Sequence, residues 1–260
     1  MILEEFDHNK LAVFNPTDIQ QKKEGFPEVV VGFFLHDLLD EFIKVYKPEK
    51  IFTIKSYTTN FDIYKITSNG VDIAVMQAPL GAPYSVSIFE EVAVLGGKYF
   101  FLAGSCGCLD NTIGEYSIFL PISAIRDEGT SYHYAPASDE IELQKDVVES
   151  IEKTLNKLKI PFAKGKTWTT DALYRETPEK VKKRKEMGAI TVDMECSAMN
   201  VLAKFRNINF GQIFYAADNL GAEEYDPRHL TISGQHDMDS KVKIISLALE
   251  CGIEIDKKFN

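Results

Sequence analysis

The sequence predicts a single α/β domain spanning residues 1–260, with a central, mixed or largely parallel β-sheet flanked by helices. Short apolar runs rich in β-branched and aromatic residues alternate with longer amphipathic stretches along the chain. Of the 260 residues, 45% are hydrophobic, which is enough for one large buried core. No Pro/Gly/Ser-rich linker divides the chain, so one domain is expected rather than two.

The two patterns define the expected elements in chain order. Strands are expected where short runs are apolar on both faces, which is typical of strands buried between layers: at 28–31, 51–54, 71–76, 99–103, 116–122, 162–169, 190–192 and 212–216. Helices are expected over the amphipathic stretches 35–46, 85–95, 140–158, 179–187, 195–205 and 240–251.

Charge and cysteine content exclude several classes of function. The net charge of −10 argues against sequence-independent binding to nucleic acid, because neutralising phosphates requires clustered Lys and Arg. The N-terminus is acidic and does not resemble a secretory signal, and no apolar stretch is long enough to span a membrane. The four cysteines suggest neither a disulfide framework nor a metal site. We therefore expect a cytoplasmic protein without metal, membrane or nucleic-acid partners.

The segment 104–108 reads Gly-Ser-Cys-Gly-Cys and follows the expected strand 99–103 directly. Small residues allow backbone N–H groups to converge on an anion, and the hydroxyl of Ser105 adds a donor. The segment, including Gly107, is a candidate ligand loop, although a tight turn that only ends a buried strand is the more frequent use of such residues. No glycine turn of the chain matches a dinucleotide-binding or Walker motif, which disfavours enzymes dependent on NAD or ATP.

The segment 191–198 places the carboxylates Asp193 and Glu195 on either side of Met194, where an expected strand gives way to an expected helix. A carboxylate there can accept hydrogen bonds from both hydroxyls of a ribose, and the thioether can lie against the apolar face of the sugar. Alternatively, the two carboxylates cap the helix. The pattern alone leaves these interpretations equal.

Asp218 follows the apolar run 212–216. Partial burial raises the pKa of a carboxyl group toward working pH, so this residue is a candidate general acid. It could equally open the turn that Asn219 and Gly221 favour.

The segment 168–177 contains Asp171 followed by Leu173 and Tyr174. An apolar and an aromatic residue after a strand can form one wall of a pocket for a planar base. The other interpretation is an ordinary loop with aromatic packing.

In this order and spacing, the four segments resemble the nucleoside phosphorylase family that includes uridine phosphorylase and the hexameric purine nucleoside phosphorylases. The stretch 124–132 (Ala-Ile-Arg-Asp-Glu-Gly-Thr-Ser-Tyr) is also similar to one found in members like uridine phosphorylase. The likeness runs from about Glu28 to the last expected helix, and it implies the phosphorylase/hydrolase-like α/β fold.

The resemblance also implies roles for individual residues. Glu195 would hold the ribose 2′- and 3′-hydroxyls, Met194 would line the sugar, and Ser105 would contact phosphate or sugar. Leu173 stands where the family usually has a phenylalanine that stacks on the base. Asp218 aligns with the aspartate that protonates the purine ring in the purine enzymes.

Base preference follows from two further positions. Thr177 and Glu179 replace the glutamine and arginine with which uridine phosphorylases hold uracil. A purine is therefore the expected base, with uridine kept as an open alternative.

The expected phosphate site departs from the family pattern. The family commonly reads Gly-Asp-Pro-x-Arg after the first strand, whereas this chain has Gly32-Phe-Phe-Leu-His36. Leu102 replaces a second phosphate arginine, and Lys55 is the candidate for a third that the family supplies across a subunit interface. Loss of bidentate donors weakens phosphate binding, which Gly32, His36, Lys55 and Ser105 would have to provide.

These expectations define three hypotheses. The first is phosphorolysis of a purine nucleoside, with inorganic phosphate as co-substrate, no cofactor, and a homo-oligomer of dimers, alone or three in a ring. The second replaces phosphate with water. Relatives that hydrolyse nucleosides also lack the arginines, but they place a glutamate near the first glycine loop, where this chain has only Asp37. The third is a catalytically weak nucleoside-binding protein.

Overall fold

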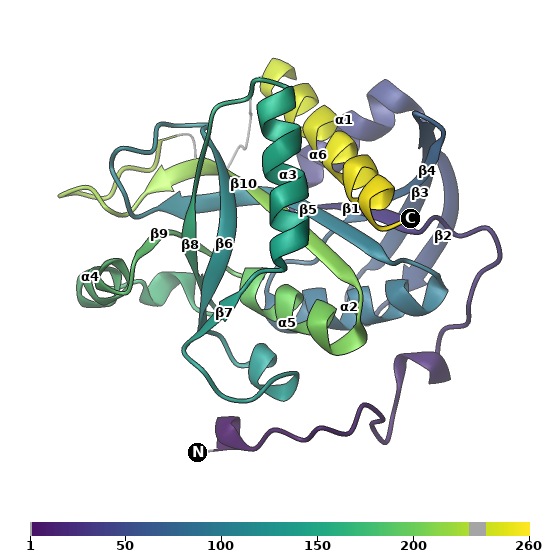
Figure 1. Cartoon of the computed structure of the whole chain (residues 1–260), viewed down its shortest axis with the longest axis horizontal. Helices are drawn as coiled ribbons and strands as arrows, with labels where there is room; N and C mark the ends of the chain where they lie inside the picture. Colours follow the sequence, from purple (N-terminus) through teal and green to yellow (C-terminus); the bar gives the residue numbers. More distant parts are fainter. Residues whose placement is uncertain (1, 229–237) are drawn as a thin grey trace.

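A single mixed β-sheet forms the centre of the molecule, and helices cover both of its faces (Figure 1). The computed structural model describes residues 2–228 and 238–260, and the side chains of 238–241 lie outside this description. The expected α/β class, with a central mixed sheet flanked by helices, is confirmed.

Ten strands form the sheet in the described part of the chain. Their bounds are β1 Val29–Phe33, β2 Glu49–Lys55, β3 Asn60–Ser68, β4 Val71–Gln77, β5 Tyr99–Cys108, β6 Ile118–Asp127, β7 Glu140–Glu142, β8 Phe162–Thr170, β9 Ala189–Asp193 and β10 Asn209–Asn219. The longer helices are α1 His36–Tyr46, α2 Ala82–Leu95, α3 Lys145–Lys157, α4 Pro178–Glu186, α5 Cys196–Arg206 and α6 Met238–Phe259. Short 3-10 helices include η3 Thr130–His133 and η4 Leu173–Arg175.

Strand β5 is the centre of the topology. The order β10-β6-β8-β9-β5-β1-β4-β3-β2 contains an additional pairing between β10 and β5, which closes β5, β10, β6, β8 and β9 into a ring. Strands β1, β4, β5 and β10 are parallel, whereas β9 runs antiparallel to β5. The ring therefore brings the ends of β5, β9 and β10 together.

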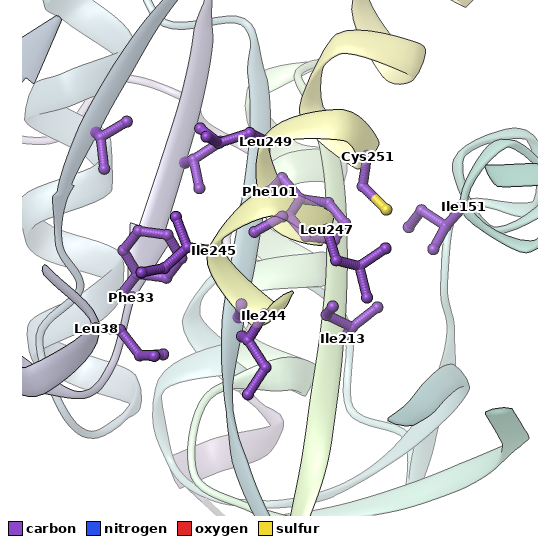
Figure 2. Packing of buried hydrophobic residues seen from close by; sticks show 14 of the residues in the cluster. Phe33, Leu38, Phe101, Ile151, Ile213, Ile244, Ile245, Leu247, Leu249 and Cys251 are labelled. Atoms are coloured by element: carbon purple, nitrogen blue, oxygen red, sulfur yellow. The ribbon is translucent and has the colours of Figure 1, made fainter. Parts of the chain in front are cut away.

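Both faces of this sheet are buried, which explains why the central strands are apolar throughout. Helices α1, α3 and α6 cover one face, and α2 and α5 cover the other (Figure 1). In the first layer, Ile245 and Leu247 of α6 lie among Phe33, Phe101 and Ile213 of the sheet (Figure 2). Burial of each such side chain contributes roughly 1.5–3 kcal/mol to the free energy of folding. This packing holds the central strands, and therefore their carboxyl ends, in place.

The expected strands and helices are present, with shifted bounds, but β3 and β7 were not expected. Strand β3 joins β4 through Asn69-Gly70, both with positive φ, which is the two-residue turn typical of hairpins. Residues 140–142, expected as the start of a helix, pair instead with β6. Helix α6 continues through Gly252, where a Cβ would lie 3.1 Å from Val29 Cγ1, so glycine permits close packing of the helix on β1.

The expected loop at 104–108 is wrong, because these residues are the last five of β5. They pair with β10 on one side, and Gly107 and Cys108 pair with β9 on the other. The ring takes up the backbone groups that a free loop would offer to a ligand. In the described residues no helix is both long and apolar enough to cross a membrane.

Candidate active site

Three segments singled out in the sequence meet at the end of β5. Gly107 is paired with Val192 of β9 on one side and with Asp218 of β10 on the other. Three segments therefore lie side by side at the end of β5: 104–108, 192–195 and 216–219. More than a hundred residues separate the first from the last.

The carboxylate of Asp193 is fully engaged within the protein. Its Oδ1 accepts hydrogen bonds from the hydroxyls of Thr167 and Thr169, both at 3.0 Å. Its Oδ2 accepts from the backbone N–H groups of Glu195 (2.8 Å) and Cys196 (2.6 Å) at the start of α5. The geometry is that of a helix cap, so Asp193 shapes the turn that presents Met194 and Glu195.

Glu195 does not cap α5, and its side chain reaches the start of α2 instead. It is buried, and its Oε1 accepts a 2.6 Å hydrogen bond from the backbone N–H of Gly81. Burial, followed by the nearby charge of Asp193, raises the pKa of Glu195 to about 8, against the opposing effect of the N–H donors of Gly81 and Met194. Gly81 has φ +87, which L side chains rarely adopt, so glycine is required where this N–H points at the carboxylate.

Met194 lies between these two buried carboxylates and is itself only half-buried. It is therefore the side chain of the turn that reaches the surface, where a flexible thioether can contact an apolar ligand face.

Asp218 lies where β10 departs from regular pairing. The register with β5 shifts between Ala216 and Asp218, a β-bulge that re-aims the side chain. A Cβ on Gly107 would lie 3.2 Å from Asp218 Oδ1, so the carboxylate rests over the glycine. The hydroxyl of Tyr225 donates a 3.1 Å hydrogen bond to Oδ2. Burial is the main cause that raises the pKa of Asp218 above its usual value.

A second carboxylate, Glu176, faces the same place. It follows η4 and is half-buried, and burial followed by the charge of Asp218 raises its pKa to about 7. Leu173 and Tyr174 of η4 are 43% and 91% exposed, so this expected base wall is open to solvent.

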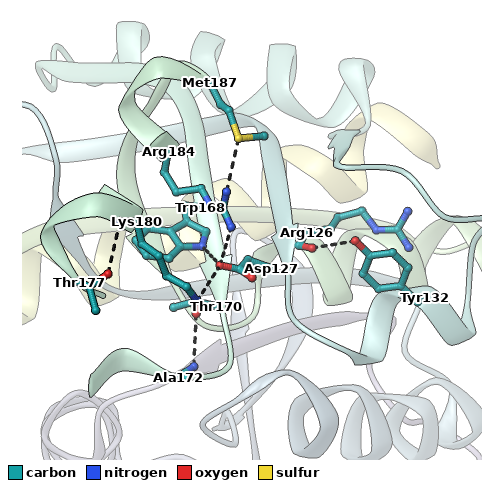
Figure 3. A network of polar contacts seen from close by, with 10 residues as sticks. All are labelled: Arg126, Asp127, Tyr132, Trp168, Thr170, Ala172, Thr177, Lys180, Arg184 and Met187. Atoms are coloured by element: carbon teal, nitrogen blue, oxygen red, sulfur yellow. Dashed lines mark hydrogen bonds and ion pairs between the residues drawn. The ribbon is translucent and has the colours of Figure 1, made fainter. Parts of the chain in front are cut away.

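The segment that carries Glu176 is anchored on both sides. Asp127 Oδ2 accepts hydrogen bonds from Trp168 Nε1 and Arg184 Nη2, both at 2.9 Å, and lies 3.7 Å from Lys180 Nζ (Figure 3). Arg184 also stacks over the Trp168 ring at 5.5 Å. This network ties α4 to β6 and β8, and it fixes the ends of the loop between β8 and α4.

The residues expected to bind phosphate are placed differently from one another. Gly32 is buried within β1, and a Cβ there would meet Leu102 at 2.5 Å, so packing explains the glycine. His36 and Lys55 are exposed at the start of α1 and the end of β2. Only Ser105 lies beside Gly107 on β5, and its hydroxyl is hydrogen-bonded to that of Tyr215.

Apolar side chains surround the positions without the family's arginines: Leu102 occupies one of them, and Phe34 precedes His36 at the other. Leu102 is fully buried, and Phe34 lies against Gly104, whose Cβ would be 2.7 Å from the Phe34 ring. Lys55 lines an open hollow of about 880 Å³ between the N-terminal segment, β2 and α2, together with Tyr84.

Three residues of this site were not assigned from the sequence. Gly81 belongs to none of the segments that resemble the family, and Glu176 lies in the segment 168–177 without a role of its own. Tyr225 carried no signal, because its contact with Asp218 depends on how the chain folds back after β10. Among the described residues, no group of His, Cys, Asp and Glu side chains is arranged to hold a metal ion.

Relatives with curated descriptions share about a quarter of their aligned residues with this chain. A guanosine phosphorylase from Halorubrum lacusprofundi is 25% identical over 166 residues, which cover 61% of this chain and 67% of that protein. A DeoD-type purine nucleoside phosphorylase from Bacillus cytotoxicus is 25% identical over 199 residues, covering 72% and 78%.

Solved structures share the fold. Purine nucleoside phosphorylase from Toxoplasma gondii, in complex with immucillin-H, matches with a TM-score of 0.75 and 19% identity, over 96% of this chain and all of that one. Uridine phosphorylase from Vibrio fischeri matches with a TM-score of 0.73 and 16% identity, over 93% and 98%. The family model described as the phosphorylase superfamily matches residues 29–250. The chain therefore belongs to the phosphorylase superfamily, as the resemblance of its site segments indicated.

Proposed function

We propose that this protein is a purine nucleoside phosphorylase, which cleaves the N-glycosidic bond with inorganic phosphate and releases free base and ribose 1-phosphate. The observation that carries the proposal is the placement of Asp218. Its half-buried carboxyl group, with a raised pKa, lies over Gly107 at the strand end where Glu195 and Met194 also emerge.

The chemistry divides between two carboxyl groups. Glu195, fixed by Gly81, accepts hydrogen bonds from the ribose hydroxyls while Met194 contacts the sugar. As the glycosidic bond loosens toward an oxocarbenium-like sugar, Asp218 gives its proton to a ring nitrogen of the departing base. Phosphate held near Ser105 then attacks the anomeric carbon. Positioning of the reactants and acid catalysis provide the rate enhancement, so the reaction needs no cofactor.

Preference for purines follows from the groups that face the base. An acid at Asp218 protonates a leaving group whose ring nitrogen becomes basic as the bond breaks. Thr177 and Glu179 offer no pairing for uracil of the kind that an amide and a guanidinium provide. Glu176 adds a carboxyl group beside Asp218, which suits a base that presents N–H donors.

Hydrolysis is the second candidate, because one observation favours it. Leu102 is buried against Gly32 at the position of one phosphate arginine, and Phe34 covers Gly104 two residues before His36, which stands at the position of another. Burial is the main cause that raises the pKa of Tyr215, the partner of Ser105, and the charge of Asp37 also raises it. Asp37 therefore lies within electrostatic range of this part of the site and is the candidate group to activate water.

A panel of inosine, guanosine, adenosine and uridine, assayed for free base with and without phosphate, tests both candidates. Base release from purine nucleosides that requires phosphate supports the proposal. Equal release in phosphate-free buffer replaces phosphorolysis with hydrolysis, and preference for uridine overturns the assignment of the base. Tight nucleoside binding without base release identifies a catalytically weak nucleoside-binding protein.

We further propose that the chain forms a homo-oligomer in the cytoplasm. The exposed Lys55 and Tyr57 at the end of β2 lie beside the hollow that the N-terminal segment lines, a surface that a second copy can complete. All four cysteines are free thiols, which suits a reducing compartment.

A further inference from the structure

The loop after β10 folds back to place a tyrosine on the proposed acid. Asn219 and Asp226 form an antiparallel bridge, with hydrogen bonds of 2.9 Å and 3.1 Å between their backbone groups. Leu220 N and Gly221 N donate to Cys108 O at 2.8 Å and 3.2 Å, so the loop is also tied to β5. These bonds fix Tyr225 opposite Asp218, and its hydroxyl donates to Oδ2.

We propose that Tyr225 is a positioning residue that directs the catalytic proton of Asp218 onto Oδ1. This inference rests on the proposed function. A carboxyl group carries its proton on one oxygen, and a hydroxyl that donates to Oδ2 requires that oxygen to remain an acceptor. The proton of Asp218 is therefore held on Oδ1, the oxygen beside Gly107 at the centre of the site.

The proton transfer then balances without another reactant. The Oδ1–H bond of Asp218 breaks, an N–H bond forms on the base, and the electron pair of the glycosidic bond moves into the base ring. Asp218 is left as a carboxylate that still accepts the Tyr225 hydrogen bond. A hydrogen bond to a charged acceptor is stronger than one to a neutral acceptor, so Tyr225 stabilises the product state of the acid.

Other groups around Asp218 bear on its titration. The positive charge of Arg228 lowers its pKa and the charge of Asp226 raises it, while Glu176 and the thiols of Cys106 and Cys108 also lie within electrostatic range. Tyr225 differs from these because it is a hydrogen-bond donor to the carboxylate itself. Its ring is 57% exposed, so replacing the hydroxyl alone leaves the core intact.

The test compares Tyr225→Phe with wild type in two measurements. In the first, the carboxyl carbon of Asp218 is titrated by NMR, with Asp218→Asn used to assign the signal. Loss of the donor should raise the pKa of Asp218, because the hydroxyl favours the ionised form. An unchanged titration overturns the inference whether or not the protein cleaves nucleosides.

In the second measurement, the pH dependence of kcat is followed with the purine nucleoside that the panel selects. Tyr225→Phe should lower the plateau of kcat about tenfold and move its basic limb to higher pH, with KM little changed. Tyr46→Phe is the matched control, since its exposed hydroxyl is hydrogen-bonded to Ser246 Oγ at 3.3 Å and not to a residue of the site. If Tyr225→Phe shifts the titration of Asp218 but keeps the kcat of wild type, the role of Tyr225 in catalysis is overturned. An inactive wild type with a shifted titration overturns the proposed function and leaves the Tyr225–Asp218 coupling established.

Discussion

The backbone N–H of Glu195 donates a 2.8 Å hydrogen bond to the carboxylate of Asp193, two residues earlier in the chain. The bond closes the turn between β9 and α5, and it places two carboxyl groups close together in a buried site. Their mutual repulsion, added to burial, keeps a proton on Glu195 well above the usual pH. The turn therefore determines both the position and the protonation of Glu195, the residue proposed to bind the ribose hydroxyls.

Asp193→Asn should lower the pKa of Glu195 while preserving the turn. The amide oxygen can accept from the N–H groups of Glu195 and Cys196, and the amide nitrogen can donate to the hydroxyls of Thr167 and Thr169. Removing the like charge favours the ionised form of Glu195. Nucleoside affinity, measured by calorimetry across pH 5–9, should depend on pH as in wild type. The pH at which the affinity changes should be lower in the variant. Asp193→Ala is the contrasting variant, and it should destabilise the fold by about 3 kcal/mol because buried donors lose their acceptor.

The raised pKa values of the site carboxyls predict lower stability at higher pH. The pKa is about 6 for Asp193, about 7 for Glu176 and about 8 for Glu195, against model values of 3.8, 4.5 and 4.5. Between roughly pH 4 and 8 the folded state therefore binds more protons than the unfolded state. The free energy of unfolding should fall as pH rises through this window, and calorimetric Tm values from pH 5 to 9 would measure it.

Glu195→Gln isolates the largest of these contributions. In this variant Tm should decline much less as pH rises. At pH 9 its free energy of unfolding should exceed that of wild type by on the order of 3 kcal/mol. Glu186→Gln, at an exposed residue of α4, is the control and should follow the wild-type curve. A wild-type Tm that rises from pH 5 to 8 would contradict the raised pKa values.

The sequence was sufficient for most of the fold because each central element is locally consistent. The run 99–103 is apolar on both faces and lies between two helix layers. The sequence misled at 104–108, where glycines indicate a turn by local propensity. Closure of the ring around β5 overrides that propensity, since a glycine at 107 leaves room for Val192 of β9, Asp218 of β10 and Leu220 just after β10.

The same distinction applies to the site. Glu195 and Asp218 could be proposed from the sequence because each lies at the end of an apolar run and matches a family segment. The separate roles of Asp193 and Glu195 were not, because the two-carboxylate pattern fits both a cap and a ligand, and only the path of each side chain decides. Gly81 contacts a residue far away in the sequence, and Tyr225 reaches Asp218 because the loop after β10 folds back, and no local pattern encodes either contact.

Glu195→Ala should weaken recognition of the ribose hydroxyls. With a purine ribonucleoside, we expect Kd to rise at least tenfold, because a buried acceptor for two hydroxyls is lost. With the 2′,3′-dideoxy analogue, wild type and variant should bind with similar affinity. Calorimetric titration of both ligands provides the measurement, and an equal loss of affinity for the two would show that Glu195 does not contact those hydroxyls.

Asp218→Asn should lower kcat on purine nucleosides by about 100-fold and leave KM and Tm nearly unchanged. The amide is isosteric and can still accept from Tyr225, but it has no acidic proton for the base. A nucleoside whose leaving group needs no protonation, such as the p-nitrophenyl riboside, should be cleaved at a rate close to wild type. Full activity of the variant on inosine or guanosine would show that the acid lies elsewhere.

Gly107→Ala tests whether the position of the Asp218 carboxyl group controls the rate. The added methyl would lie 2.5 Å from Leu220 Cδ1 and 3.2 Å from Asp218 Oδ1, so the carboxylate must shift. Gly165→Ala in β8 is the matched variant, because its methyl would lie 2.8 Å from Ile190 Cδ1 with no carboxylate nearby. Both should lose about 1–3 kcal/mol of stability through overpacking. Only Gly107→Ala should also lose kcat, by about 100-fold, since small misplacement of a catalytic group is costly. Equal kcat in the two variants, measured well below their Tm, would separate Gly107 from the chemistry and leave it a packing residue.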